Sequence, residues 1–287
     1  MNEALAKLTG GVAVITGAGS GIGEGLAREA AAAGMKVVLA DIAQDRIDAL
    51  AADIKRDGGE ALPVVTDVSD PQALEALADR VFDTFGSVRL LINNAGIETL
   101  GLTWEIPAAT WEKTLDINIH GVIHGVRAFA PRMIDAGEQA FIANTSSIGA
   151  LGIMPVQTSY ILSKHAVLAF SECLYLEMQL KQLPISVSAI LPGPVATRIF
   201  TDSAGTDDEV SRFHRKVMED MLADNGMTGR EAAKIILPQI AAGEFWVSTH
   251  PEMTGEYAAN RARHLTALSA PALPPEVLAS LGAANTN

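Results

Sequence analysis

Short apolar runs alternate with longer segments of helical hydrophobic spacing along the first two thirds of the chain. Such runs predict buried strands, and apolar residues recurring three or four positions apart predict helices. Six strands are expected, at 12–15, 36–40, 61–66, 88–92, 140–145 and 185–191. Helices are expected between them, at about 21–33, 45–55, 71–85, 107–133 and 159–181.

This regular alternation also predicts the fold class. Right-handed crossovers between consecutive parallel strands place helices on both faces of one sheet. We therefore expect an α/β fold with a doubly wound, Rossmann-like parallel sheet. No domain boundary is indicated before residue 192, and we expect a single domain over 1–268.

The pattern changes between 194 and 227, where polar and acidic residues surround large apolar ones whose spacing is irregular for a core helix. The stretch 206–209 (TDDE) is typical of a helix start. We interpret 198–227 as a mobile lid over a bulky apolar substrate; packing onto its own domain or a neighbouring subunit is the alternative. The apolar residues concerned are Phe200, Phe213, Met218, Met221 and Leu222.

The remainder is predicted to add a helix from 228 to 242, a short strand at 244–247 and a further helix that carries Tyr257 and Arg261. The first of these helices opens with Thr228 and Glu231 in capping-box spacing. The end, 269–287, is rich in alanine and proline, and we expect a surface tail there.

A glycine-rich stretch from Thr16 to Gly23 (TGAGSGIG) joins the first predicted strand to the first helix. Its four glycines allow a tight turn and expose N–H groups to a diphosphate at the positive end of the helix. The register is T-G-x-x-x-G-x-G, because Ile22 stands where the third glycine of G-x-G-x-x-G would fall. The stretch predicts a dinucleotide site, with an ordinary strand-to-helix turn as the alternative.

Asp41 ends the second predicted strand, eighteen residues after Gly23. A carboxylate there can hydrogen-bond the adenosine ribose hydroxyls and would repel a 2′-phosphate. Ser20 and the residues just after Asp41 offer no cation, and Arg46 is expected on the following helix. We therefore expect NAD rather than NADP, with a helix-capping aspartate as the alternative interpretation.

Tyr160 and Lys164 lie four residues apart on a predicted helix and so share one of its faces. A nearby ammonium favours the phenolate form of a tyrosine, whose reference pKa is about 10, and so prepares a general acid/base. The preceding strand ends in Asn144-Thr145-Ser146-Ser147, and ligands bind at the carboxyl ends of such strands. The pairing alone is a weak pattern, because many amphipathic helices carry it by chance.

Charge and composition narrow the classes of partner. The chain has 287 residues, a formal net charge of −13 and 48% hydrophobic residues, which disfavours binding to nucleic acid or to an anionic membrane surface. Cys173 is the single cysteine, so there is no disulfide within the chain and no cysteine-based metal site. With no secretion signal and no apolar run long enough to span a bilayer, we expect a cytoplasmic protein without membrane association.

His120 and His124 have the spacing of a metal-binding pair on a helix, but no carboxylate or cysteine completes a recognisable set. No metal is therefore expected.

An ordered series of motifs resembles the short-chain dehydrogenase/reductase family over residues 8–198. The series comprises the glycine turn, Asp67-Val68, Asn93-Asn94-Ala95-Gly96, Asn118, Ser147, Tyr160-x-x-x-Lys164 and Pro192-Gly193-Pro194-Val195-x-Thr197. In the family pattern a serine precedes the tyrosine by thirteen residues, which selects Ser147 over Ser146. The resemblance implies hydride transfer between a small-molecule secondary alcohol or ketone and a nicotinamide cofactor.

The resemblance also implies residue roles. Tyr160 exchanges the proton, Lys164 lowers the tyrosine pKa and holds the nicotinamide ribose, Ser147 hydrogen-bonds the substrate oxygen, and Asn118 positions a water. The implied cofactor site comprises Gly17, Ser20, Gly21, Ile22, Gly23, Asp41, Ile42, Asp67, Val68, Asn94, Ala95, Gly96, Tyr160, Lys164, Pro192, Gly193, Val195 and Thr197.

Two further readings stay open. Family members are usually homo-oligomers, but this chain has Ser248-Thr249-His250-Pro251 where many carry Asp-Gly-Gly at a subunit interface, so dimer and tetramer remain alternatives. A nucleotide-binding regulator without turnover is the competing function, because fold alone does not establish activity.

Overall fold

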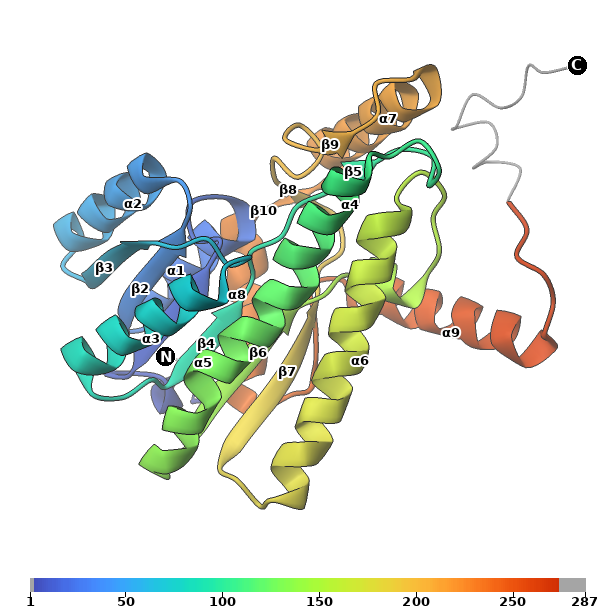
Figure 1. Ribbon diagram of the computed structural model, residues 1–287. Helices are drawn as coiled ribbons and strands as arrows, with labels where there is room; N and C mark the ends of the chain where they lie inside the picture. The colour runs from blue at the N-terminus through green and yellow to red at the C-terminus, as the bar shows by residue number, and fades with distance from the viewer. Residues whose placement is uncertain (1–2, 274–287) are drawn as a thin grey trace, which may run out of the picture.

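The computed structural model describes residues 3–273 and has a seven-stranded sheet at its centre (Figure 1). The strand order is β11-β7-β6-β4-β1-β2-β3, and every neighbouring pair is parallel. This confirms the predicted α/β class, and the predicted strand ends are correct to within two residues. The strands are β1 Val12–Thr16, β2 Lys36–Asp41, β3 Glu60–Val65, β4 Leu90–Asn93, β6 Ala140–Thr145, β7 Ile185–Leu191 and β11 Trp246–Ser248.

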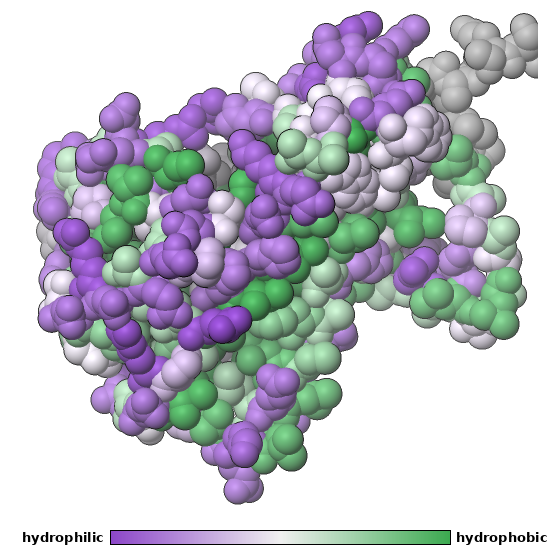
Figure 2. Space-filling view, viewed as in Figure 1, coloured by the Kyte–Doolittle hydropathy of each residue, from purple (hydrophilic) through white to green (hydrophobic). Residues whose placement is uncertain are grey.

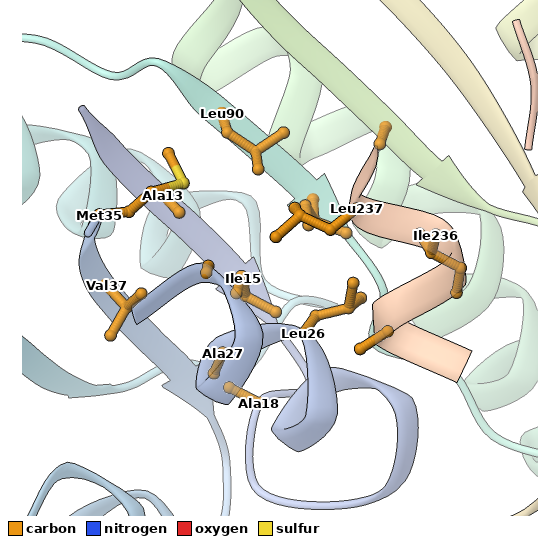
Figure 3. Packing of buried hydrophobic residues seen from close by; sticks show 14 of the residues in the cluster. Ala13, Ile15, Ala18, Leu26, Ala27, Met35, Val37, Leu90, Ile236 and Leu237 are labelled. Atoms are coloured by element: carbon orange, nitrogen blue, oxygen red, sulfur yellow. The ribbon is translucent and has the colours of Figure 1, made fainter. Parts of the chain in front are cut away.

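Helices cover both faces of the sheet (Figure 1). Because successive strand residues point to opposite faces, Ala13 and Ile15 of β1 pack with α1, α2 and α8, whereas Val12 and Val14 pack with α3, α5 and α6. Figure 3 shows the first cluster, in which Leu26 and Ile236 come from opposing helices. The helices are α1 Gly21–Ala32, α2 Gln44–Arg56, α3 Pro71–Phe85, α5 Gly121–Ala136, α6 Thr158–Leu180 and α8 Gly229–Ala242.

The single helix predicted over 107–133 is interrupted in the structure. It consists of α4 Ala108–Leu115, a π turn at Asp116–His120, and α5. A π turn widens the helix by one residue and is frequent at functional sites. Here it carries Asn118, and the hydrophobic spacing of the sequence gave no sign of it.

The segment 198–227 is more regular than its apolar spacing suggested. It contains β9 Ala204–Gly205, which pairs with β5 Thr99–Leu100, and the 17-residue helix α7 Glu209–Asn225. Asp208 caps α7 by accepting the N–H of Ser211 at 3.1 Å, as the TDDE stretch predicted. β10 Met227–Thr228 then pairs with β8 Val195–Ala196.

α7 is amphipathic, which explains the scattered apolar residues of its sequence. Met218, Met221 and Leu222 pack with Phe200 and Leu100 in a small cluster of their own. Figure 2 shows that the outer surface of α7 is hydrophilic. The helix therefore lies over the carboxyl ends of the sheet strands with its apolar face inward (Figure 1).

The C-terminal elements follow the sequence prediction. α8 begins with a capping box between Thr228 and Glu231, and α9 Pro251–Ala267 carries Tyr257 and Arg261. Residues 269–273 form neither helix nor strand, and the rest of the predicted tail lies outside the described residues. Within residues 3–273, the helices all fall short of the length and apolarity that a bilayer crossing requires.

Close backbone contact between α1 and α8 gives a stability prediction. A Cβ at Gly25 would lie 2.2 Å from the Gly229 carbonyl oxygen. We expect Gly25→Ala to lower the free energy of unfolding by about 1–3 kcal/mol, because the helices must separate. Gly255→Ala on α9 is the control, since its Cβ meets nothing within 4 Å. Urea unfolding of both variants measures the difference, and equal stability would contradict the close packing.

Candidate active site

A cavity of about 700 Å³ lies at the carboxyl ends of the sheet strands and brings most of the predicted site residues together. Two predicted residues, Gly23 and Asn118, do not line it. The predicted residues that do are Gly17, Ser20, Gly21, Ile22, Asp41, Ile42, Asp67, Val68, Asn94, Ala95, Gly96, Ser147, Tyr160, Lys164, Pro192, Gly193, Val195 and Thr197.

The glycine turn forms one end of this cavity, and its geometry needs glycine. Gly17 and Gly21 have φ of 65° and 56°, and a Cβ at Gly17 would lie 2.8 Å from Ala95 Cα. A Cβ at Gly23 would lie 2.1 Å from the Gly17 carbonyl oxygen, so Gly23 closes the turn from behind. α1 starts at Gly21 and directs its N-terminus here. Such a cradle fits the diphosphate of a dinucleotide.

Thr16 holds this turn against the loop after β4, a role the sequence prediction missed. Its Oγ1 accepts the N–H groups of Asn94 at 2.9 Å and of Ala95 at 3.1 Å. The Asn94 side-chain amide donates in return to the Thr16 carbonyl oxygen at 3.1 Å. The two loops that would contact a cofactor are thus fixed relative to each other.

Asp41 lies at the adenosine end of the predicted cofactor site. Its two carboxylate oxygens accept the N–H groups of Gly19 at 2.8 Å and of Ala43 at 2.9 Å. Arg46 is on α2 as expected, but it also lines the cavity beside Asp41. The expectation that no cation stands beside Asp41 is therefore corrected, because Arg46 and Asp41 line the same cavity.

The other end of the cavity carries the predicted catalytic residues. Tyr160 and Lys164 project from α6, and Lys164 Nζ donates to the Thr145 carbonyl oxygen at 3.0 Å and lies 5.4 Å from the Tyr160 ring centroid. Ser146 Oγ donates to the Lys164 carbonyl oxygen at 2.7 Å. Ser147 Oγ accepts the N–H of Gly149 at 3.0 Å, and Ser147 lies near enough to the Tyr160 phenol to lower its pKa.

Burial governs the ionisation of both residues. It raises the pKa of Tyr160 above its ordinary value, the charge of Glu98 raises it further, and the Ser147 hydrogen bond lowers it. Burial lowers the pKa of Lys164 to about 8. The expected lowering of the tyrosine pKa by Lys164 is therefore not found in the protein alone, where Ser147 is the lowering influence.

Asn118 is a positioning residue in this structure. From the π turn, its Oδ1 accepts the N–H of Ile97 and its Nδ2 donates to the Ile97 carbonyl oxygen, both at 2.9 Å. Nδ2 also donates to Ser163 Oγ at 3.0 Å, one turn from Tyr160. Asn118 thus ties α6 to the loop after β4, and its implied role in holding a water stays a prediction.

Apolar residues of the predicted lid line the substrate end. Phe200, Met218, Met221 and Leu222 face the cavity, whereas Phe213 does not and is 40% exposed. Glu98, Gln157 and Met253 also line the cavity wall and were not predicted. Glu98 directly follows the Asn-Asn-Ala-Gly-Ile stretch, and this place after a predicted strand end could have indicated that it lines the cavity. Nothing in the sequence distinguished the other two.

The two histidines of α5 and the π turn lie near one carboxylate. His120 Nδ1 is 2.8 Å from Asp116 Oδ1, and the His120 and His124 ring centroids are 6.1 Å apart. Across the described part of the chain, no group of three or more His, Cys, Asp or Glu is arranged to hold a metal ion.

The low pKa of Lys164 predicts a pH-dependent stability difference. Its folded pKa of about 8 lies below the reference 10.5, so the buried charge destabilises the fold fully below pH 8 and progressively less up to 10.5. Lys164→Met removes this cost, up to about 3 kcal/mol before the lost hydrogen bond is counted. We expect the stability of the variant relative to wild type to fall between pH 7.5 and 10.

Urea unfolding at the two pH values measures this difference. Lys181→Met, at the exposed end of the same helix, is the control and should show no such trend. A pH-independent difference for Lys164→Met would contradict a depressed lysine pKa.

Comparison with known proteins agrees with this site. The family model described as short chain dehydrogenase matches residues 11–208. A solved short chain dehydrogenase/reductase from Burkholderia phymatum in complex with NAD is 32% identical with a TM-score of 0.89, over 93% of this chain and 98% of that one. A metagenomic short-chain oxidoreductase in complex with NADP is 27% identical with a TM-score of 0.68, over 85% and 97%. Solved neighbours thus include both cofactors.

Curated relatives include two kinds of oxidoreductase. "Probable oxidoreductase EphD" of Mycobacterium tuberculosis is 37% identical over 73% of this chain, and this chain covers 36% of the length of that protein. "1-deoxy-11-beta-hydroxypentalenate dehydrogenase" of Streptomyces avermitilis is 36% identical over 64% of this chain and 68% of that one.

Proposed function

The chain belongs to the short chain dehydrogenase family, and from this premise we propose that it interconverts a secondary alcohol and a ketone with NAD. The observation that carries the proposal is the shared cavity. The Tyr160 phenol and the Ser147 hydroxyl stand together at one end, and the glycine turn and Asp41 form the other. The family binds nicotinamide cofactors; the preference for NAD is our inference from Asp41.

The residues at the catalytic end suit alcohol oxidation. When bound, the nicotinamide supplies the hydride acceptor. Once ionised, Tyr160 can accept the proton of the substrate hydroxyl, and Ser147 can donate a hydrogen bond to the developing oxyanion. Because the pKa of Tyr160 is raised, its phenol must first lose its own proton. Lys164 holds its ammonium behind the tyrosine ring through the Thr145 carbonyl oxygen. In ketone reduction the same groups act in reverse.

The substrate end of the cavity favours a bulky ring. Phe200, Met218, Met221 and Leu222 form an apolar part of the cavity wall, against which a cyclic or aromatic alcohol would bury most of its surface. The name of the hydroxypentalenate dehydrogenase relative also specifies a substrate hydroxyl group. We further propose a homo-oligomer, as family resemblance implies, in the cytoplasm, as expected from a chain with a single cysteine.

A panel of secondary alcohols tests the proposal. The protein is incubated with NAD and with cyclic, aromatic and short aliphatic alcohols, and NADH is followed at its absorbance maximum. We expect NADH from the cyclic or aromatic members above all. Nicotinamide binding without turnover of any member would instead favour the nucleotide-binding regulator.

The lid gives a separate prediction. We expect amide hydrogen exchange across 198–227 to slow when NAD and a bulky ketone bind together, because closure over the ligand excludes water. α8 serves as the internal reference, since its apolar face is already buried in the main core. Unchanged exchange in the lid, together with faster oxidation of short aliphatic alcohols than of bulky ones, would contradict this role.

A further inference from the structure

Two buried polar atoms in the cavity wall have no hydrogen-bond partner. They are Glu98 Oε2 and Gln157 Nε2, whose residues are 1% and 5% exposed and both line the cavity. The other Glu98 oxygen accepts the N–H of Thr99 at 3.0 Å. A buried polar group without a partner costs about 1–3 kcal/mol. A ligand that satisfied both groups would recover this cost.

Both residues line the same cavity as Tyr160. Gln157 stands three residues before Tyr160, directly before α6. Glu98 is near enough that its charge raises the pKa of both Tyr160 and Lys164.

Backbone contacts hold the two segments that carry these groups together. The N–H of Gly101 donates to the Val156 carbonyl oxygen at 2.8 Å, and Ser159 Oγ reaches the Thr99 carbonyl oxygen at 3.5 Å. Val156 has φ of 69°, a left-handed conformation that is strained for a β-branched residue and persists only where the surroundings enforce it. Gln157 is therefore presented to the cavity by a firmly held turn.

The chemistry of the two groups selects a ligand. The Gln157 amide nitrogen can only donate. Burial raises the pKa of Glu98 well above its ordinary value, and its free oxygen accepts when ionised and also donates when protonated. A hydroxyl is the smallest uncharged substituent that serves both partners in either state, because it both donates and accepts. An ether oxygen cannot donate, and a methyl group can do neither.

Resting on the proposed function, we propose that Glu98 and Gln157 bind a second hydroxyl of the substrate, next to the carbinol that reacts at Tyr160. Preferred substrates are then diols and hydroxy ketones on an apolar ring, rather than simple mono-alcohols. The apolar lid residues contact the ring, and this polar pair fixes its orientation.

Isosteric alcohols test the subsite. 1,2-Cyclohexanediol and 2-methylcyclohexanol share one skeleton, with a hydroxyl in place of a methyl group; 1,3-cyclohexanediol and 3-methylcyclohexanol form the second pair. We expect wild-type kcat/KM with NAD to favour the diol of at least one pair by about tenfold or more. Glu98→Leu and Gln157→Leu should bring that ratio near one. Gln179→Leu, exposed on the same helix, should leave it unchanged.

Glu98→Gln guards against a folding defect, because it keeps an oxygen for the Thr99 N–H. In this variant both side chains present an amide donor to the ligand. The ratio of kcat/KM for the diol to kcat/KM for its methyl counterpart should therefore fall but stay above one. Calorimetric binding of the same alcohols to Tyr160→Phe with NAD gives a readout independent of turnover. Equal affinity within both pairs, or a preference that survives both leucine replacements, overturns the subsite. Tighter diol binding with no NADH from any alcohol in wild type supports the subsite and rejects the proposed function.

Discussion

Tyr160→Phe should lower kcat by about 10² to 10⁴ while leaving the dissociation constant for NAD nearly unchanged. In the proposed reaction the phenol exchanges a proton with the substrate oxygen, and general acid/base groups contribute rate factors of this size. Phenylalanine retains the ring against which Lys164 Nζ lies at 5.4 Å. The glycine turn at the cofactor end of the cavity is unchanged by this substitution, so the affinity for NAD should stay the same.

Tyr175→Phe is the matched control for this variant. It removes a phenol hydroxyl from the same helix, and the Tyr175 ring packs edge-on against Phe245, with ring centroids 5.1 Å apart, and does not line the cavity. Stopped-flow fluorescence reports NAD binding, and steady-state assays report kcat. Near-native turnover of Tyr160→Phe would reject tyrosine as the acid/base group.

Replacing Asp41 should change cofactor preference. We expect wild type to favour NAD over NADP in kcat/KM by about 10² or more, because a like charge placed opposite a 2′-phosphate costs several kcal/mol. Asp41→Ala should reduce the ratio greatly. Asp41→Asn keeps one oxygen for the Gly19 or Ala43 N–H and so separates the effect of charge from that of loop geometry.

Arg46 makes this test sharper. Once the carboxylate is gone, its guanidinium is the cation in this part of the wall that can pair with a phosphate. Arg46→Ala added to Asp41→Ala should therefore weaken NADP use again, whereas Asp48→Ala, exposed on the same helix, should change neither cofactor. Equal or better use of NADP by wild type would contradict the Asp41 argument.

The sheet was predictable because its signals are local. The core strands are short runs dominated by apolar residues, such as Val12–Thr16, and the cap formed by Thr228 and Glu231 lies within one helical turn. Most of the site was predictable for a related reason, since its residues follow strands directly. Parallel strands bring their carboxyl ends to one edge of the sheet, so order along the chain becomes proximity in space.

The features that sequence reasoning missed depend on contacts between distant segments. The π turn at Asp116–His120 leaves the apolar spacing on both sides intact, and strands such as β5 and β9 have two residues each, too few for any periodicity. The burial of Glu98 arises because residues 98–101 lie against 156–159, and Arg46 reaches the cavity because α2 begins beside the glycine turn. No local pattern encodes these placements.

Isotope transfer tests the assigned chemistry most directly. A cyclic secondary alcohol carrying deuterium on its carbinol carbon is incubated with the protein and NAD, and the reduced cofactor is examined by mass spectrometry and proton NMR. Direct hydride transfer predicts NADH with one deuterium at C4 of the nicotinamide, on a single face, and the matching ketone in equal amount. Ketone formation with unlabelled NADH, or no reduced cofactor from any alcohol that binds, would contradict it.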